Sequence, residues 1–513
     1  MGQAFLPAFA KLIIPWQAGM PDLLQVFGNT LLDLSKGAPM KLKSKVSKHN
    51  RSTQQHLIIA LALLLAAVFV FELPRAESAP PAEFPSLAEA CEPVGRLISG
   101  NTVRVGKPGV ELSCTPLPGE STVTAFEENS HFLCVTAEVS TEEGKPSFVR
   151  RFLLLKPSVL VVDDVIRQPT PGQAVQWQVN CRSAAKLVDG RLSVADSQRE
   201  LTCQRLWPAD EKAASATVSG NVYRLELKPS GDTGEVRLLH VIELREAGQE
   251  GGPAQSVLKK NDGCLELSIK TADRSYSLEL PTPGTEAGWL EVGQADGETL
   301  VPRRPLPSGV LPHGPEGMKL IERWDRHYRK GGPAPWDSGH PAKDLKEAVE
   351  NESIRPCRTV ILGCGSGTNA IYLAGKGFDV TAIDVAPTAL ALAEKEAKKA
   401  GVEVRWVLAD VLALPKLEKF DLIFDRGCYH NVRYVDAAGF VESMRQLSRP
   451  GTKAFILSLD RDSAPGVREP TMRTDFSGSF DFSWLKNSKI NTGKDGKREH
   501  ASWSTMLLRK KEK

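Results

Sequence analysis

A cluster of glycines between a short strand and a helix constrains the fold of this chain most. Residues 359–362 are predicted to form a buried strand, and residues 370–374 a helix. Between them lie Gly363, Gly365 and Gly367. Glycine suits such a turn because a side chain would block the approach of a ligand to the backbone. The next predicted strand, residues 379–383, ends at Asp384, where a carboxylate can accept hydrogen bonds from both hydroxyls of a ribose. The pattern favours an adenosine-containing cofactor.

Strands and helices alternate through residues 318–513. This alternation predicts an α/β fold with a Rossmann-like, doubly wound and mainly parallel sheet. The further predicted elements are a helix at 387–399, strands at 402–408 and 420–424, a helix at 436–447, and strands at 453–459 and 503–509. Asp425 and His430 follow the strand at 420–424, at the carboxyl edge of the sheet. Folds of this kind place their ligands at that edge.

The spacing of the glycines distinguishes between cofactors. A dinucleotide-binding turn reads G-x-G-x-x-G, and Thr368 stands where the last glycine would be, so the motif is G-x-G-x-G instead. Together with Leu362, it resembles the first signature of class I S-adenosylmethionine-dependent methyltransferases. The resemblance extends through most of residues 318–513. It implies S-adenosyl-L-methionine as cofactor and methyl transfer as the reaction.

The resemblance also implies which residues bind the cofactor. Asp410 matches the position that contacts the adenine amino group, and Val411 the position that packs on the ring. Trp336 and Asp337 match the aromatic N-terminal lid of the thiopurine and tellurite-resistance branch, which excludes water from cofactor and acceptor. Ile361 departs from the family, which commonly has an acidic residue there. The full implied set is Gly363, Gly365, Gly367, Asp384, Asp410, Val411, Trp336 and Asp337.

Asp425 and His430 are the candidate catalytic residues. Methyl transfer needs mainly alignment, with a base only where the acceptor carries a removable proton. An imidazole titrates in the right range to deprotonate a thiol or hydroxyl, although a histidine at a helix start or on the surface fits the sequence equally well. Cys428 fits a packing role better than that of a nucleophile.

The acceptor is expected to be a small molecule. The residues that follow the strand at 420–424 do not match the Asn-Pro-Pro-Tyr type of loop that methylates amino groups of nucleic acids. A net charge of +3 supplies no bulk basic field for nucleic acid. We therefore expect a thiol or another soft nucleophile, and no nucleic-acid partner. The sequence has no CxxC pair and no HExxH, so we expect no metal site.

Residues 95–300 differ in character from the rest of the chain. Short alternating or β-branched runs predict an antiparallel β-sandwich, with the strongest strands at 148–155 and 159–165. Such strands bury one face and expose the other to water. With Trp177 in a further strand, this region resembles the C-terminal β-domain of the heparinase II/III polysaccharide lyases. The resemblance implies an accessory module with a polysaccharide as candidate ligand. It does not imply lyase activity, because nothing here matches the helical toroid of those enzymes.

Two adjacent carboxylates, Asp163 and Asp164, close the predicted strand at 159–165. Neighbouring residues on a strand point to opposite faces, so the two cannot easily serve one site. Capping of a turn is the preferred interpretation. The tryptophans of this region are expected in the core rather than against sugar rings; they are Trp177, Trp207 and Trp289.

An apolar run at residues 57–71 follows several basic residues and is typical of a signal peptide or membrane anchor. At about 1.5 Å per residue it spans about 22 Å, short of the roughly 30 Å hydrocarbon core of a bilayer. We assign it, with its basic flank, to residues 40–80. Residues 1–39 are an uncertain N-terminal extension, because Met40 would make a natural start. A Pro-rich linker is predicted at residues 302–317.

These signals predict a membrane-associated or exported protein, with residues 57–71 in contact with the membrane if uncleaved. S-adenosylmethionine is cytosolic, so activity would require cytoplasmic placement of residues 318–513. The alternative function is an exported or membrane-anchored polysaccharide-binding or lyase-related protein whose methyltransferase domain is vestigial.

Overall fold

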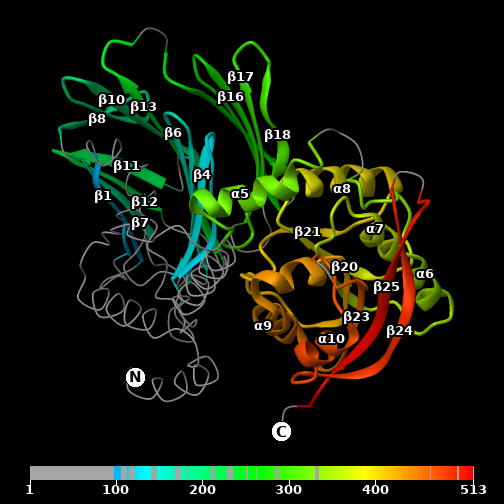
Figure 1. The fold of residues 1–513 in the computed structure, drawn as a ribbon. Helices are drawn as coiled ribbons and strands as arrows, with labels where there is room; N and C mark the ends of the chain where they lie inside the picture. The colour runs from blue at the N-terminus through cyan, green and yellow to red at the C-terminus, as the bar shows by residue number, and fades with distance from the viewer. Residues whose placement is uncertain are drawn as a thin grey trace, which may run out of the picture. The chain divides into compact units, whose positions relative to one another are not determined.

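The computed structural model describes residues 98–511 in one compact unit, and Figure 1 shows strands followed by an α/β segment. The gaps in the description are residues 106–111, 115–121, 140–146, 168–174, 182, 209–213, 228–234, 250–251, 262, 283–287, 330–333, 463 and 494–495. The predicted extension at 1–39 and the basic and apolar segment at 40–80 lie outside the described residues.

Three antiparallel sheets precede the α/β segment. In spatial order, the first contains β11 (Ala214–Ser219), β12 (Val222–Leu227), β7 (Val175–Cys181), β1 (Ile98–Val105) and β2 (Leu112–Cys114). The second contains β3 (Thr122–Glu128), β4 (Phe132–Val139), β5 (Ser147–Leu155), β6 (Val159–Arg167), β13 (Glu235–Glu246), β10 (Arg199–Trp207), β9 (Arg191–Ala195) and β8 (Ala185–Val188). The third contains β14 (Gln255–Asn261), β15 (Cys264–Lys270), β16 (Arg274–Pro281), β17 (Trp289–Gln294) and β18 (Thr299–Pro305).

The second sheet carries apolar clusters on both of its faces. On one face, Leu160 of β6 belongs to the same cluster as Trp177 of the first sheet. On the other face, Val161 belongs to the same cluster as Leu267 of the third sheet. The sequence predicted strands with one wetted face, but β6 is buried along its length from Val159 to Ile166. The difference arises because a third sheet covers the face that we expected to be exposed.

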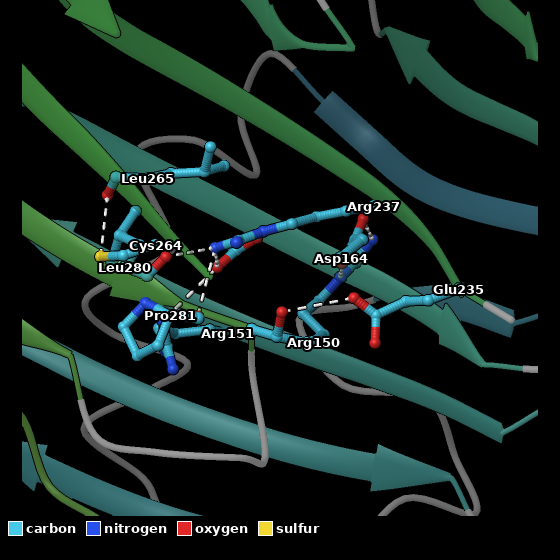
Figure 2. A network of polar contacts seen from close by, with 11 residues as sticks. Arg150, Arg151, Asp164, Glu235, Arg237, Cys264, Leu265, Leu280 and Pro281 are labelled. Atoms are coloured by element: carbon cyan, nitrogen blue, oxygen red, sulfur yellow. Dashed lines mark hydrogen bonds and ion pairs between the residues drawn. The ribbon is translucent and has the colours of Figure 1, made fainter. Parts of the chain in front are cut away.

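Asp163 and Asp164 lie within β6 rather than at a turn. Asp164 accepts two hydrogen bonds from the Arg150 guanidinium, at 2.6 and 2.7 Å, and one from the Trp177 indole at 3.1 Å. Asp163 accepts two from Arg237, both at 2.8 Å, and Arg237 also donates to backbone carbonyls of β16 (Figure 2). The prediction that the two carboxylates point to opposite faces is confirmed. The turn-capping interpretation is wrong, because each carboxylate pairs with an arginine of a neighbouring strand, Asp164 with the buried Arg150 and Asp163 with the partly buried Arg237.

The predicted core position of Trp177 is confirmed, since its side chain is 1% exposed and stacks on His240. Trp207 and Trp289 are partly buried, and each lies under a cation, Lys260 and Arg303 respectively.

The α/β segment forms one sheet whose strand order is β21-β20-β19-β22-β23-β25-β24. The parallel strands are β19 (Arg358–Leu362), β20 (Asp379–Asp384), β21 (Arg405–Leu408), β22 (Phe420–Arg426) and β23 (Ser448–Leu459). β25 (Arg498–Arg509) runs antiparallel between β23 and β24 (Phe480–Thr492). The helices are α6 (Lys343–Glu350), α7 (Thr368–Ala374), α8 (Pro387–Ala400), α9 (Tyr429–Leu447) and α10 (Glu469–Phe476). The mainly parallel, doubly wound prediction is confirmed.

Two expectations about the chain are revised. Residues 302–317, predicted as a linker, contain the end of β18 and the beginning of α5 (Gly314–Asp325). The predicted membrane-associated or exported placement is corrected, because within the part of the chain that the structure describes no helix is long and apolar enough to cross a membrane. The apolar run at 57–71, on which that expectation depended, lies outside the described residues.

Candidate functional site

The turn between β19 and α7 contains three glycines with positive φ angles. These are 64° at Gly363, 57° at Gly365 and 82° at Gly367. A Cβ at Gly363 would lie 2.7 Å from the Cβ of Cys428, and one at Gly365 would lie 2.9 Å from the hydroxyl of Tyr328. A Cβ at Gly367 would lie 2.7 Å from a side chain of α8. Glycine is therefore required here both by the backbone conformation and by close packing against three neighbouring segments.

Asp384 ends β20 beside this glycine turn. One carboxylate oxygen accepts a hydrogen bond from the backbone N–H of Gly365 at 2.7 Å, and the other from that of Ala386 at 2.9 Å. Burial raises the pKa of Asp384, while these backbone donors act in the opposite direction. The interactions fix the carboxylate against the glycine turn.

Asp410 and Val411 follow β21. Asp410 is partly buried and accepts a hydrogen bond from the backbone N–H of Leu412 at 2.9 Å, and burial raises its pKa. The Val411 side chain is 6% exposed and belongs to an apolar cluster that also contains Val407. In the turn after β21, the partly buried Asp410 carboxylate therefore lies next to the buried side chain of Val411.

Trp336 and Asp337 both contact the surroundings of the glycine turn. Asp337 accepts hydrogen bonds from the hydroxyls of Ser366 and Thr368, the latter at 3.4 Å. Three aromatic rings of the preceding segment surround Trp336, with centroid separations of 4.8 to 6.3 Å: Trp324, His327 and Tyr328. The backbone carbonyl of Trp336 accepts hydrogen bonds from Arg426 at 3.4 and 3.5 Å. The segment that contains Trp336 therefore joins the glycine turn to the end of β22.

Asp425 is fully buried near the end of β22. Its carboxylate accepts hydrogen bonds from the backbone N–H groups of Tyr429 at 2.9 Å and Gly427 at 3.2 Å. Burial raises the pKa of Asp425 to about 7. A carboxyl group with this pKa exchanges a proton near neutral pH, which is the property expected of a general base.

His430 lies in the first turn of α9 and is 6% exposed. Its Nδ1 accepts a hydrogen bond from the backbone N–H of Leu459 at 3.2 Å. A backbone N–H can only donate, so in the neutral imidazole Nδ1 carries the lone pair and Nε2 carries the proton. Burial lowers the pKa of His430 to about 4, with Arg461 and Arg426 acting in the same direction. In the neutral form, the His430 imidazole can therefore donate a hydrogen bond from Nε2.

A cavity of about 490 Å³ adjoins the carboxyl end of β22 and β23. Most of its lining comes from residues 338–350, which include α6, and from β24, while Arg426 and Leu457 are its contributions from β22 and β23. Arg426 is partly buried and donates to the carbonyl of Asn491 at 2.7 Å, but within the described chain it forms no ion pair. Arg426 belongs to no motif that the sequence reveals, although it directly follows Asp425 at the carboxyl edge of the sheet.

Tyr328 was likewise not assigned to the site. Its side chain is 4% exposed, and its hydroxyl faces the glycine turn. Burial raises its pKa, with Asp384 acting in the same direction. Among the described residues, no group of three or more His, Cys, Asp or Glu side chains is arranged to hold a metal ion.

Comparison with known proteins places this site in a family context. Residues 360–451 match a family model described as a methyltransferase domain. A 2-heptyl-1-hydroxyquinolin-4(1H)-one methyltransferase of Mycobacteroides abscessus is 25% identical over 192 residues, which are 34% of this chain and 84% of that protein. Probable thiol methyltransferase 2 of Arabidopsis thaliana is 26% identical over 148 residues, 28% of this chain and 64% of that protein.

Hemagglutinin 1 of Eikenella corrodens is 31% identical over 137 residues, 27% of this chain and 43% of that protein. Among solved structures, TehB from Haemophilus influenzae matches with a TM-score of 0.29 at 15% identity, over 57% of this chain and 76% of that one. The matched family model lies wholly within the α/β segment. Residues 360–451 of this chain therefore form a methyltransferase domain, and its cofactor is S-adenosylmethionine.

Proposed function

We propose that this protein transfers a methyl group from S-adenosylmethionine to a small molecule, and that the acceptor is a thiol or another soft nucleophile. The observation that carries the proposal is the position of Asp425, a buried carboxyl group with a pKa of about 7, on the strand next to the glycine turn. Relatives whose names include thiol and thiocyanate methyltransferases support this acceptor class.

The residues around the glycine turn fit the cofactor. A carboxylate offers about four lone-pair positions, so beside its contacts with the backbone of Gly365, Val385 and Ala386 the Asp384 carboxylate can still accept a hydrogen bond from a ribose hydroxyl. Asp410 accepts a hydrogen bond from the backbone N–H of Leu412 and can also accept one from an adenine amino group. Glycine at 363, 365 and 367 lets the turn take its left-handed backbone conformation while neighbouring segments approach it closely. When bound, the cofactor supplies an electrophilic methyl group on a sulfonium.

On the acceptor side, Asp425 takes the proton of the thiol. With the cofactor bound, the thiolate sulfur would form a bond to the methyl carbon as the bond from that carbon to the sulfonium broke, which would leave a neutral thioether on each product. Asp425 suits this step because the efficiency of a base is greatest when its pKa lies near the working pH. His430 remains neutral and donates from Nε2, which suits a role in orienting rather than deprotonating.

The neighbouring cavity supports a small acceptor. Its volume of about 490 Å³ lies within the range of about 300–1,000 Å³ typical of small-molecule sites. Arg426 supplies a positive charge to its wall. Trp336 and its aromatic neighbours limit the access of water to the glycine turn, which protects the transfer step.

The test is to incubate the full chain with S-adenosylmethionine and a panel of small thiols and inorganic soft nucleophiles, and to measure S-adenosylhomocysteine by mass spectrometry. We expect product with at least one of these acceptors, at a rate that Asp425→Asn lowers at least tenfold. A chain that binds the cofactor but methylates none of them, while it methylates hydroxyl or amine acceptors, would contradict the proposed acceptor class.

A further inference from the structure

The segment at residues 308–311, here called the strap, connects the strand-rich part of the chain to the methyltransferase domain. Within this compact unit, it lies between β3 of the second sheet and the end of β21. We propose that the strand-rich part, acting through the strap, positions the turn that carries Asp410 and Val411, and thereby sets the affinity for the adenine side of the cofactor. This inference rests on the proposed function.

Backbone hydrogen bonds tie the strap to both partners. The N–H of Ser308 donates to the carbonyl of Leu408 at 2.9 Å, at the end of β21. On the other side, the N–H of Phe126 donates to the carbonyl of Gly309 at 3.1 Å, and the N–H of Leu311 donates to the carbonyl of Phe126 at 3.0 Å. Because β21 is an edge strand, the strap uses a backbone carbonyl that the sheet leaves unpaired.

Adjacent strap side chains enter different hydrophobic clusters. Val310 packs against the cluster between the first and second sheets, which contains Trp177. Leu311 is 1% exposed and belongs to a cluster with Leu390 of α8 and Leu408 of β21. A movement of the strap would therefore disturb packing on both sides. The strap thus fixes the position of the end of β21 relative to β3.

Gly309 contacts the turn that follows β21. A Cβ at this position would lie 3.2 Å from the Cβ of Ala409, 3.2 Å from the carbonyl oxygen of Ala413 and 3.1 Å from the Cδ of Pro415. Ala409 directly precedes Asp410, and Ala413 and Pro415 follow Val411 by two and four residues in the same turn segment. A Cβ at position 309 therefore requires these neighbours to yield by a few tenths of an ångström, and a larger side chain requires more, so substitution here strains the turn that carries Asp410.

A second connection lies beside the strap. Arg303 of β18 donates two hydrogen bonds to Glu279 of β16, both at 2.9 Å, and also binds Glu394 of α8. Its guanidinium stacks on Trp289 at 4.0 Å. The third sheet holds this arginine, which reaches α8, the helix that follows Asp384. The strand-rich part therefore contacts both segments predicted to bind adenosine, the one next to Asp384 and the one that carries Asp410.

Movement of the Asp410 turn should change KM and kcat differently. Displacement of the Asp410 turn weakens an interaction made equally in the ground state and the transition state, so the KM for S-adenosylmethionine rises while kcat stays the same. Asp425, Arg426 and the acceptor cavity lie on other strands, so the KM for the acceptor also stays the same.

The experiment compares the full chain with Gly309→Ala and Gly309→Val. The matched control is Gly478→Ala, because a Cβ at Gly478 meets no atom within 4 Å and its φ is not positive. The Kd for S-adenosylhomocysteine is measured by calorimetry and the two KM values by initial rates, and circular dichroism checks the fold. We expect the Kd and the KM for S-adenosylmethionine to rise about threefold in Gly309→Ala and about tenfold or more in Gly309→Val, with no change in the control.

If Gly309→Val fails to fold, Gly309→Ala and Arg303→Met still test the proposal, and each is expected to show the same split between KM and kcat. Wild-type affinity in folded Gly309→Ala and Arg303→Met would overturn the inference and leave the proposed function standing. A wild-type chain that does not bind S-adenosylhomocysteine would overturn the proposed function, and this inference with it.

Discussion

At the scale of single residues, burial acts in opposite directions on the pKa values of Asp425 and His430. It raises that of Asp425 to about 7 and lowers that of His430 to about 4, because a buried site disfavours the charged form of each group. At neutral pH the imidazole is therefore already neutral. Asp425 is the member of the pair that changes its protonation near neutral pH.

We predict that kcat/KM rises with pH through about 7, as Asp425 loses its proton, and that Asp425→Asn abolishes this rise together with most of the activity. The measurement is a pH–rate profile of both proteins with one acceptor. A wild-type profile with its midpoint near 4, the pKa of His430, would instead assign the base to the imidazole.

The same carboxyl group affects stability. Its folded pKa of about 7 exceeds the unfolded value of about 3.9, so the folded state binds more protons between these values and stability falls as pH rises through this window. Asp425→Asn removes this penalty. The Tm of the variant minus the Tm of the wild type should therefore be larger at pH 8 than at pH 4. A Tm difference that is the same at both pH values would contradict the assigned pKa.

The sequence revealed the glycine turn and Asp384 because their spacing reports backbone geometry directly. It could not reveal that Nδ1 of His430 accepts a hydrogen bond from Leu459, since that contact joins α9 to a distant strand end. The role of Tyr328 beside Gly365 was hidden for the same reason.

At the scale of elements, the sequence predicted the strongly apolar strands of the doubly wound sheet. It did not predict β24 or α10. β24 alternates exposed and partly buried residues at the edge of the sheet, which gives a weak sequence signal. α9 begins at Tyr429 rather than near residue 436, where Asp436 interrupts the helix with non-helical angles. The burial of both faces of β6 could not be predicted, because the covering sheet is formed by later residues.

The ion pair between Arg150 and Asp164 gives a prediction at this scale. Removal of one member of a buried pair leaves an uncompensated charge, so Asp164→Leu should cost about 3–5 kcal/mol in the free energy of unfolding. The double variant with Arg150→Leu should recover most of this loss. Urea unfolding followed by tryptophan fluorescence measures both, because Trp177 contacts Asp164. A double variant no more stable than the single one would contradict a charge-based cost.

At the scale of the whole molecule, composition and pattern separated a strand-rich part from an α/β part. They did not show how the two parts are joined, because the proline-rich residues 302–317 are typical of a free linker. Instead, this region pairs with β3 and β21 through backbone hydrogen bonds. The proposed cofactor site should therefore be measured in the full chain, with the strap intact.

The most direct test of the account is a calorimetric titration of S-adenosylmethionine into the full chain, with Asp384→Asn as the test variant. The matched control is Asp379→Asn, at the opposite end of β20, where the side chain is exposed. The account predicts saturable binding by the wild type and the control, and at least about tenfold weaker binding by Asp384→Asn. A folded wild-type chain that does not bind, or an Asp384→Asn variant that binds as well as the wild type, would contradict the assigned cofactor site.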